Sequence, residues 1–393
     1  MQGNGIKTAC LDWAVFSGYA GYAASTAVIP MVLVPMGQEM KFDLSSGGAL
    51  HLVSRCMMIF SMLLAGAASR RFGKKNILSV SILLIAAGLA ICGTAAEYMV
   101  LIAALVVTGL GNGLFESLAT GFMQDRHPGK SAGRYINLTH SFWPLGILLT
   151  GLLAGAWLQY GGSWQVLLFI LTGLLVIPVL LFQAGGRQPS GDPVPAFKWK
   201  DYCVPLKNPR FILFLAALFL TGGSEHCVTF WTPSYIASEY SGRGFICGSG
   251  VALFVAGMFI GRAAGGLLKI RPDRLIIICS VLAAVSAPLI PLVRSVWLLL
   301  VLLPMLGIAI GPLWPSLQYC CTSCLKQYDA TLLYILMPLF GIPGCGICTF
   351  LLGLIGGKFG LQTGFYLVFA CNLMIAALIA IHWRLESKQR SDI

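Results

Sequence analysis

Two carboxylates lie inside long apolar stretches of this chain. Glu116 falls within the apolar run 99–123 and Glu225 within the run 211–237. A charged side chain is costly in hydrocarbon, so a carboxylate within such a span usually faces the protein interior or a water-filled path and has a function. A buried carboxyl group is suited to taking up and releasing protons. We therefore predict that both glutamates are proton-coupling groups.

Each carboxylate also has a structural alternative. Glu116 would be structural if Arg55, near the middle of the apolar run 46–69, neutralised it. Glu225 would be structural if a basic residue of a neighbouring span paired with it. Arg55 itself has two candidate roles, the counter-ion of Glu116 and the binder of an anionic substrate group. The corresponding place in the second half of the chain holds Val255, so the repeat does not require an arginine there.

Further hydrogen-bonding side chains occur at a similar depth. Asn112 and Glu116 are four residues apart and so share one helix face. Gly109 and Gly113 form a neighbouring stripe, where small residues let another helix approach closely. A polar stripe beside a small-residue stripe is typical of a helix that lines a cavity. The other candidate substrate-binding residues, chosen because they hydrogen-bond or stack, are Asn137, His140, Trp143, His226, Trp231, Trp314 and Gln318.

Two basic residues also have structural interpretations. Pro144 follows His140 by four residues and removes the helix hydrogen bond to the His140 carbonyl, which predicts a kink. His140 is then either a hydrogen-bonded structural histidine or a gate or substrate contact. Arg262 lies near one end of the apolar run 249–268, and we expect it to snorkel to the cytoplasmic surface in a structural, gating role.

The composition identifies the scaffold that must position these groups. Of 393 residues, 57% are hydrophobic and 10% are charged, with a mean hydropathy of +0.83. Soluble domains contain about 25% charged residues, so the chain is predicted to be an all-α membrane protein. Each crossing needs about 20 apolar residues. Twelve candidate transmembrane helices cover 11–36, 46–69, 76–97, 99–123, 133–157, 163–184, 211–237, 249–268, 274–293, 296–320, 330–355 and 363–384.

The spans divide into two sets of six. We predict an N-terminal lobe at 1–184, a cytoplasmic linker at 185–210 and a C-terminal lobe at 211–393. Gly109 and Gly113 match Gly307 and Gly311 at a shift near 200 residues, which indicates an internal repeat. Parallel six-helix repeats are typical of a transporter with its site at the lobe interface.

The net charge of +12 is explained by topology rather than by nucleic acid, because lysines and arginines gather between the spans. With the N-terminus inside, most of them lie in inner segments, which predicts a multi-pass inner-membrane protein with both termini cytoplasmic. The apolar run after Lys7 is too long for a cleavable signal, so we expect it to be the first span.

The turn after the second span carries a recognisable motif. The residues Gly66, Arg70, Arg71, Gly73 and Lys74 resemble the loop motif of the major facilitator superfamily, except that Arg70 stands where that family usually has an aspartate. The resemblance implies a two-lobed fold of twelve helices and a gating role for the loop.

A narrower resemblance is to the fucose–proton symporter family. The glycine-rich run that ends at Glu116 is similar to its fourth helix, and the segment from Asn137 through His140 to Gly146 is similar to its fifth-helix signature. Glu225 with Trp231 resembles the seventh helix of related hexose carriers. The first-helix aspartate of the family is missing at the matching depth. The resemblance implies proton-coupled sugar uptake.

These observations predict a monomeric secondary transporter that works by alternating access and takes up a sugar or related polar solute with protons. Na⁺ is the alternative coupling ion, and the lipid bilayer and a small-molecule substrate are the expected partners. An exporter of organic anions, amphiphiles or drugs is the alternative function, and a receptor or lipid scramblase is the alternative of another class. No nucleotide-binding or hydrolase motif occurs, so we expect neither an enzyme nor a cofactor. The two CxxC pairs lack partner ligands, so no metal is expected.

Overall fold

The computed structural model describes residues 2–41, 44–186, 199–240 and 244–391, and within these ranges the regular structure is helical, with no strand. Among these described residues, twelve stretches of helix are long and apolar enough to cross a membrane, which confirms the twelve predicted spans. They extend over Ala9–Val32, Leu52–Phe72, Lys74–Gly93, Tyr98–Arg126, Ala132–Leu158, Trp164–Ala184, Pro209–Pro233, Gly248–Leu267, Pro272–Leu292, Val296–Cys324, Ala330–Phe359 and Leu361–Leu385.

The chain divides into two compact units. Unit 1 comprises residues 1–128 and 142–197, and unit 2 comprises residues 129–141 and 198–393. The helix α5 (Ala132–Gln159) is therefore shared, because its first turns pack with unit 2 and the remainder packs with unit 1. Of the predicted linker 185–210, residues 187–198 lie outside the described part of the chain.

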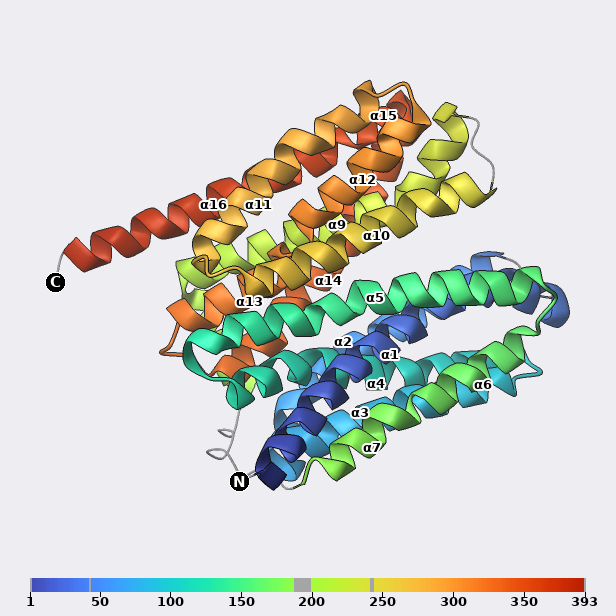
Figure 1. Ribbon diagram of the computed structural model, residues 1–393, viewed down its shortest axis with the longest axis horizontal. Helices are drawn as coiled ribbons and strands as arrows, with labels where there is room; N and C mark the ends of the chain where they lie inside the picture. The colour runs from blue at the N-terminus through green and yellow to red at the C-terminus, as the bar shows by residue number, and fades with distance from the viewer. Residues whose placement is uncertain (1, 42–43, 187–198, 241–243, 392–393) are drawn as a thin grey trace. The chain divides into compact units, whose positions relative to one another are not determined.

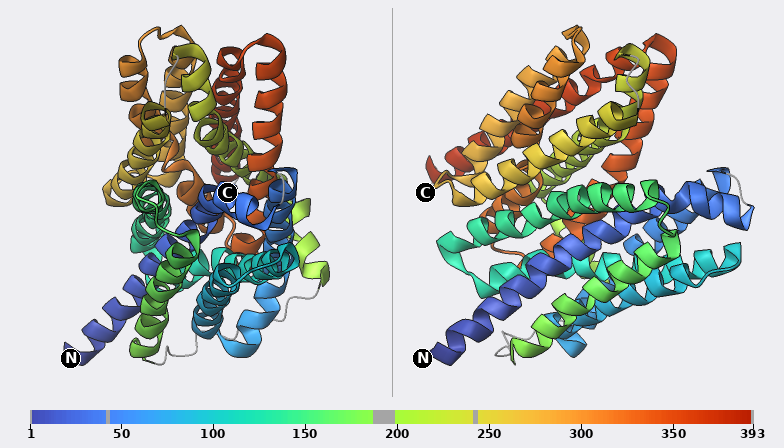
Figure 2. Two further views of the ribbon diagram at one scale, coloured as in Figure 1. Left: turned by 90° about the vertical axis from the view of Figure 1, so that its right-hand side faces the viewer. Right: turned by 45° about the vertical axis from the view of Figure 1, so that its right-hand side comes forward.

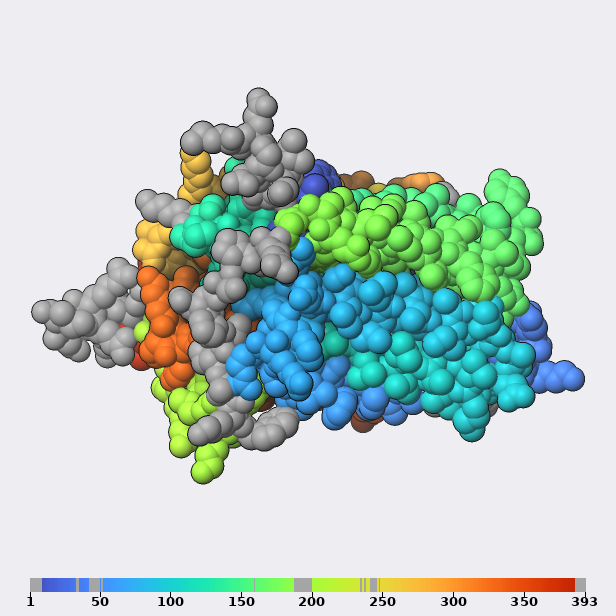
Figure 3. Space-filling view, turned by 90° about the horizontal axis from the view of Figure 1, so that it is seen from below, coloured from blue at the N-terminus to red at the C-terminus, as the bar shows by residue number. Residues whose placement is uncertain are grey.

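Unit 1 is a bundle of long helices (Figure 1). Besides the longer part of α5, it contains α1 (Gln2–Met40), α2 (Leu44–Phe72), α3 (Lys74–Gly93), α4 (Tyr98–Arg126), α6 (Trp164–Leu174) and α7 (Val176–Ala184). Figure 3 shows α3 and α4, in blue to cyan, beside α6 and α7, in green, on one face of this unit. Large apolar side chains such as Leu83, Leu174 and Leu180 are exposed, as a surface in contact with lipid requires.

Glycines let α4 approach its two neighbours closely. The position of a Cβ on Gly109 would collide with the backbone carbonyl of Ser54, and one on Gly113 with that of Met58, both on α2. Gly111 faces the Ser81 carbonyl of α3 in the same way. The predicted small-residue stripe is therefore confirmed as the packing surface between α4 and α2.

Unit 2 repeats this packing arrangement. Gly307 of α12 (Val296–Ile310) and Gly311, which follows that helix, lie against the carbonyls of Phe254 and Met258 on α10 (Gly244–Leu267). The fourth and tenth spans therefore contact the second and eighth spans through matched glycine pairs. This agreement confirms the internal repeat that the sequence spacing predicts.

The other helices of unit 2 complete its bundle (Figure 2). They are α8 (Trp199–Cys203), α9 (Pro209–Tyr240), α11 (Pro272–Ser286), α13 (Leu313–Cys324), α14 (Ala330–Phe359), α15 (Leu361–Gly364) and α16 (Tyr366–Ser391), with short 3₁₀ turns at Gly129–Ser131, Pro205–Lys207 and Ala287–Leu292. Gly222 and Gly344 bring α9 and α14 together, since each lies against a backbone carbonyl of the other helix.

Candidate functional site

In unit 1, the polar face of α4 meets α1. Glu116 is 6% exposed, and its Oε2 lies 3.5 Å from the hydroxyl of Tyr19, which donates to it. The same hydroxyl lies 3.4 Å from Oγ1 of Thr120. One turn earlier on α4, Asn112 is 3% exposed, and its Oδ1 lies 3.2 Å from the Ser25 hydroxyl. The structure therefore places Asn112 and Glu116 in one buried polar strip between the two helices.

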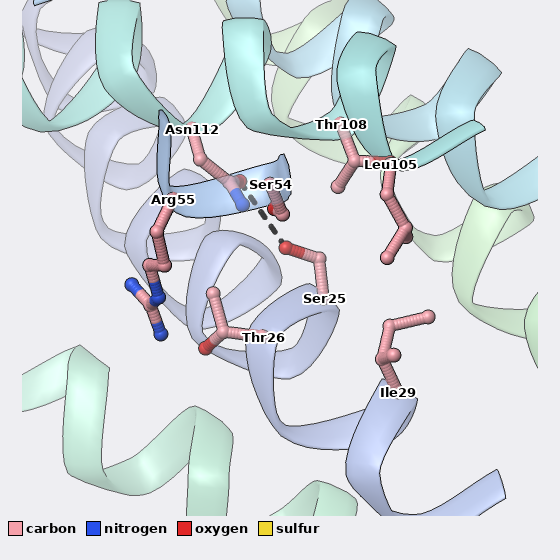
Figure 4. A pocket seen from close by; sticks show the side chains of 8 residues that line it. All are labelled: Ser25, Thr26, Ile29, Ser54, Arg55, Leu105, Thr108 and Asn112. Carbon is pink, nitrogen blue, oxygen red and sulfur yellow. Dashed lines mark hydrogen bonds between the residues drawn. The ribbon is translucent and has the colours of Figure 1, made fainter. Parts of the chain in front are cut away.

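A pocket opens beside this strip. Its wall is formed by three helices, with Ser25, Thr26 and Ile29 from α1, Ser54 and Arg55 from α2, and Leu105, Thr108 and Asn112 from α4. Figure 4 shows the Arg55 side chain reaching toward Thr26, next to the Ser25–Asn112 hydrogen bond. Nη1 of Arg55 also lies 3.6 Å from the sulfur of Met58. Two of the predicted substrate-binding residues, Arg55 and Asn112, therefore share one pocket.

Aromatic rings pack beside the buried strip. The rings of Tyr22 and Trp143 have centroids 4.7 Å apart, and Phe115 lies 5.3 Å from Tyr19 and 6.0 Å from Tyr22. Trp143 thus belongs to an aromatic cluster on the same side of α1 as Glu116. A ring cluster next to hydrogen-bonding groups is the combination that binds polar solutes with apolar faces.

A further ionic cluster of unit 1 is missing from the sequence-based site. Asp12 of α1 is 9% exposed, and its Oδ1 lies 2.9 Å from Nε of Arg126 and 3.0 Å from Nε2 of His127. The one feature of the sequence that could have indicated this cluster is an aspartate about one turn into the first apolar span. Its two partners lie 114 and 115 residues away along the chain, so the pairing depends on how α1 and α4 pack.

The loop motif adopts a tight turn between α2 and α3. Gly73 has φ of +80°, a conformation that favours glycine, and it precedes the first residue of α3. Gly66 is buried, whereas Arg70 and Arg71 are exposed. Lys74 pairs with Asp125 at 2.7 Å. The loop motif therefore forms a glycine turn, beside an ion pair made by Lys74.

In unit 2, the second carboxylate is held in an ion pair. Oε2 of Glu225, on α9, lies 2.8 Å from Nη2 of Arg262, on α10, and the two side chains are 8% and 3% exposed. The structure therefore shows the arrangement that the sequence left as the alternative for Glu225. It also corrects the expectation that Arg262 snorkels to a surface, because the guanidinium is turned inward to the carboxylate.

The remaining donors of Arg262 bind two backbone carbonyls. Nη1 lies 3.1 Å from the carbonyl of His140, and Nε lies 2.9 Å from that of Gly311. The guanidinium thus joins α9, α10, the start of α5 and the break between α12 and α13. His140 is itself buried.

Other predicted residues of unit 2 are buried polar groups. Asn137 donates from Nδ2 to the Gly133 carbonyl at 3.0 Å, while its Oδ1 has no hydrogen-bond partner among the described residues. Gln318 is fully buried, and its amide group interacts with the side chain of His140. His226, next to Glu225, is partly exposed. Buried polar atoms of this kind usually mark the place of water or of a bound polar molecule.

The two predicted tryptophans of unit 2 pack against glycines. Trp231 donates from Nε1 to the Thr349 carbonyl at 2.9 Å, and its ring lies against Gly353. The Trp314 ring lies against Gly222 and Gly341 and is 9% exposed. Both rings therefore help pack α14. In the described residues, no group of three or more His, Cys, Asp or Glu side chains is placed to hold a metal ion.

The fold resembles solved transporter structures over nearly the whole chain. The Escherichia coli fucose:proton symporter FucP superposes with a TM-score of 0.79 at 16% identity, covering 94% of this chain and 98% of that one. The human organic anion transporter MFSD10 (TETRAN) superposes with a TM-score of 0.75 at 15% identity, covering 95% and 99%. At these identities the likeness concerns the fold alone.

Curated relatives match in sequence over shorter stretches. The niacin transporter NiaP of Acinetobacter baylyi is 26% identical over 169 residues, 43% of this chain and 38% of its own length. An MFS-type efflux pump, LUC4, of Fusarium is 20% identical over 170 residues, 42% of this chain and 29% of its own length. The chain thus spans well under half the length of either relative.

The family itself is identified by a broader match. The family model of the Major Facilitator Superfamily matches residues 15–331, which include the loop motif, both glycine pairs and both buried glutamates. With twelve apolar helices, two glycine-matched halves and this match, the chain belongs to the Major Facilitator Superfamily, a family of membrane transporters.

Proposed function

We propose that this transporter takes up a small polar solute, a sugar or a related compound, together with protons, by alternating access. The observation that carries the proposal is the position of Glu116. Its carboxyl group is almost fully buried inside a membrane span, on the same helix face as Asn112 and beside a pocket that contains hydrogen-bonding side chains.

The coupling follows from the cost of moving a bare charge through a low-dielectric interior. An ionised Glu116 without a bound proton would oppose any rearrangement that takes it further from water. A proton on Glu116 removes that charge, and the Tyr19 hydroxyl at 3.5 Å can hydrogen-bond the carboxyl group in either state. Loading of the proton and the solute would then allow the carrier to reorient.

Glu225 has a different part in this proposal. Its carboxylate accepts a hydrogen bond from Arg262, so Oε2 is already engaged with a guanidinium N–H. We assign the proton-coupling role first to Glu116 and regard Glu225 as a group that holds α9 to α10 and exchanges protons if that pair separates.

The comparisons support the polar-solute proposal without fixing the substrate. Two proteins that share this fold are described as a fucose:proton symporter and a proton:xylose symporter, and the relative NiaP is described as a niacin transporter. The second candidate function is the export of an organic anion, which the guanidinium of Arg55 in the pocket favours and which the human organic anion transporter parallels in fold.

The test is uptake into liposomes containing the purified protein. A panel of labelled sugars, sugar acids and organic anions is offered with and without an imposed pH gradient. Glu116→Gln should abolish gradient-driven accumulation and leave solute exchange. The matched control is Glu97→Gln, which makes the same chemical change at an exposed residue just before α4. Accumulation by Glu116→Gln that equals the control would remove Glu116 from the coupling mechanism.

A further inference from the structure

We propose that Glu39 and Glu239 are positioning residues that hold the ends of two transmembrane helices. Each carboxylate bonds to a glutamine of its own unit and thereby fixes a short helical tip that can swing at a proline. The two tips are residues 36–40 of α1 and residues 234–240 of α9. The inference goes beyond the proposed function, because it depends on neither the transported solute nor the coupling ion.

The tip of α1 extends past its membrane span. The span ends at Val32, and the helix continues to Met40. Glu39 is exposed, and its Oε2 accepts from Nε1 of Trp164 at 2.7 Å. Nε2 of Gln165 lies 3.0 Å from Oε1 and 3.1 Å from Oε2 of the same carboxylate. The first turn of α6 thus holds Glu39, and the partial positive charge at that helix end favours a carboxylate. We call this contact the α1 clasp.

The tip of α9 makes the corresponding contact in unit 2. Its span ends at Pro233, and the helix continues to Tyr240. With the amide of Gln362 oriented to donate, its nitrogen lies 3.0 Å from Oε1 and 2.8 Å from Oε2 of Glu239. We call this contact the α9 clasp. In each unit, therefore, the end of the first span is bonded to the start of the last span.

The internal repeat relates the two clasps. Gln165 is the second residue of the sixth span, and Gln362 is the second residue of the twelfth. The two glutamates are 200 residues apart and the two glutamines 197, close to the shift of the glycine pairs. Other polar positions are not repeated, since Trp314 stands where the first half has Glu116. A polar pair that recurs at matched helix ends points to a role that both units share.

A proline lies at the base of each tip. Pro35 follows the end of the α1 span, and Pro233 is the last residue of the α9 span. Because proline has no N–H, the carbonyls of Met31 and Thr229, one turn earlier, lose their helix hydrogen bonds. The helix is weakened at these points, and bending there moves the tip while the rest of the helix stays in place.

The clasps can open without unfolding the unit. Both carboxylates are exposed, so water can replace either partner, and such contacts contribute little to global stability. The α9 tip has further bonds, because the hydroxyls of Tyr235 and Tyr240 donate to the carbonyls of Ile290 at 3.2 Å and Val293 at 2.6 Å. Opening of a clasp should therefore release the α1 tip more than the α9 tip.

The experiment measures hydrogen–deuterium exchange of the full-length protein in lipid nanodiscs. Gln165→Glu places two carboxylates against each other and should open the α1 clasp. We expect the amides of residues 36–40 to exchange roughly 5- to 30-fold faster, while those of Ala9–Val32 stay within about twofold of the unmodified protein. The double variant Glu39→Gln with Gln165→Glu exchanges the amide and the carboxylate, and it should restore slow exchange at the tip.

Further variants test the hinge and the repeat. Added to Gln165→Glu, Pro35→Ala restores an N–H for the Met31 carbonyl and should slow the exchange of the tip. Gln362→Glu should accelerate exchange in the α9 tip by a smaller factor, because the two tyrosine bonds remain. Glu97→Gln removes a carboxylate at an exposed residue just before α4, and as the control it should leave both tips unchanged.

Several results overturn the inference. Unchanged exchange of residues 36–40 in Gln165→Glu would mean that the carboxylate does not hold the tip. Faster exchange over the whole of α1, or no rescue in the double variant, would mean that the substitution disturbs the fold instead of opening a clasp. No slowing by Pro35→Ala would refute the hinge. These measurements need no solute, so their outcome is separate from that of the uptake assay.

Discussion

Nη2 of Arg262 lies 2.8 Å from Oε2 of Glu225 inside unit 2, and the arginine side chain of this ion pair is 3% exposed. The other two donating groups of Arg262 reach the carbonyls of His140 and Gly311. Proline stands four residues after each of these carbonyls, at Pro144 and Pro315. Because proline has no N–H, neither carbonyl can accept the usual helix hydrogen bond. The guanidinium therefore replaces two missing backbone donors while it neutralises a carboxylate.

Removing the arginine should be costly for this reason. Arg262→Gln leaves the Glu225 carboxylate buried without its cation, and breaking a buried pair from one side costs about 3–5 kcal/mol. We expect a loss of this size in the free energy of unfolding, measured by denaturant titration of the purified protein in detergent. Lys74→Gln is the control, because its partner Asp125 has a side chain that is 48% exposed and such pairs contribute about 0–1 kcal/mol. Equal losses of unfolding free energy in the two variants would show that the buried pair contributes no more to stability than the more exposed one.

The proline arrangement gives a second prediction. Pro144→Ala restores an N–H that can donate to the His140 carbonyl, so this substitution should be more favourable for stability when Arg262 is absent. In a double-mutant cycle with Arg262→Gln, we expect a coupling free energy of about 1 kcal/mol in favour of the double variant, the net value of one hydrogen bond. Pro291→Ala, in the turn after α11, serves as the uncoupled control. Additive effects of Pro144→Ala and Arg262→Gln would mean that the carbonyl contact contributes nothing.

The sequence predicts the scaffold well because its signals are local. Each span is an apolar run of about 20 residues, and the distribution of lysine and arginine separates the runs. The sequence also predicts the close helix contacts at the Gly109–Gly113 and Gly307–Gly311 pairs, since small residues at four-residue spacing mark such contacts. The placement of Asn112 and Glu116 on one face needed only the helix period.

The sequence does not predict which side chains of different helices pair with one another. Glu225 and Arg262 are 37 residues apart, and their contact depends on the rotation of α9 and α10 about their axes. When this rotation is unknown, the general expectation for an arginine near the end of a span is that its side chain snorkels to the membrane surface. The loss of the His140 carbonyl's helix bond was predictable from Pro144, but the donor that replaces it comes from another helix. Asp12 escaped notice because its partners, Arg126 and His127, lie at the far end of α4.

The glycine contacts predict a matched set of stability changes. Gly109→Ala and Gly307→Ala place a methyl group against a neighbouring backbone, and overpacking of this kind costs about 1–3 kcal/mol. Gly151→Ala and Gly346→Ala add the same methyl group where nothing lies within 4 Å. In these controls alanine should stabilise the helix by about 0.5–1 kcal/mol. Melting temperatures of the four variants in one detergent provide the comparison, and a uniform shift across them would rule out the close approach of the paired helices.

The ionic cluster of unit 1 should also contribute to stability. Asp12 accepts from Arg126 at 2.9 Å and contacts His127 at 3.0 Å, and the aspartate and arginine side chains are 13% and 7% exposed. Asp12→Asn removes the negative charge that these groups share and leaves Arg126 partly buried without a counter-ion, which should cost about 3 kcal/mol. Glu97→Gln is the control, because it makes the same carboxylate-to-amide change at an exposed residue whose side chain makes no cap hydrogen bond to α4. That control should lose no more than about 0.5 kcal/mol. Denaturant titration of both variants measures the difference, since an equal loss for Asp12→Asn and Glu97→Gln would mean that the cluster does not hold α1 to α4.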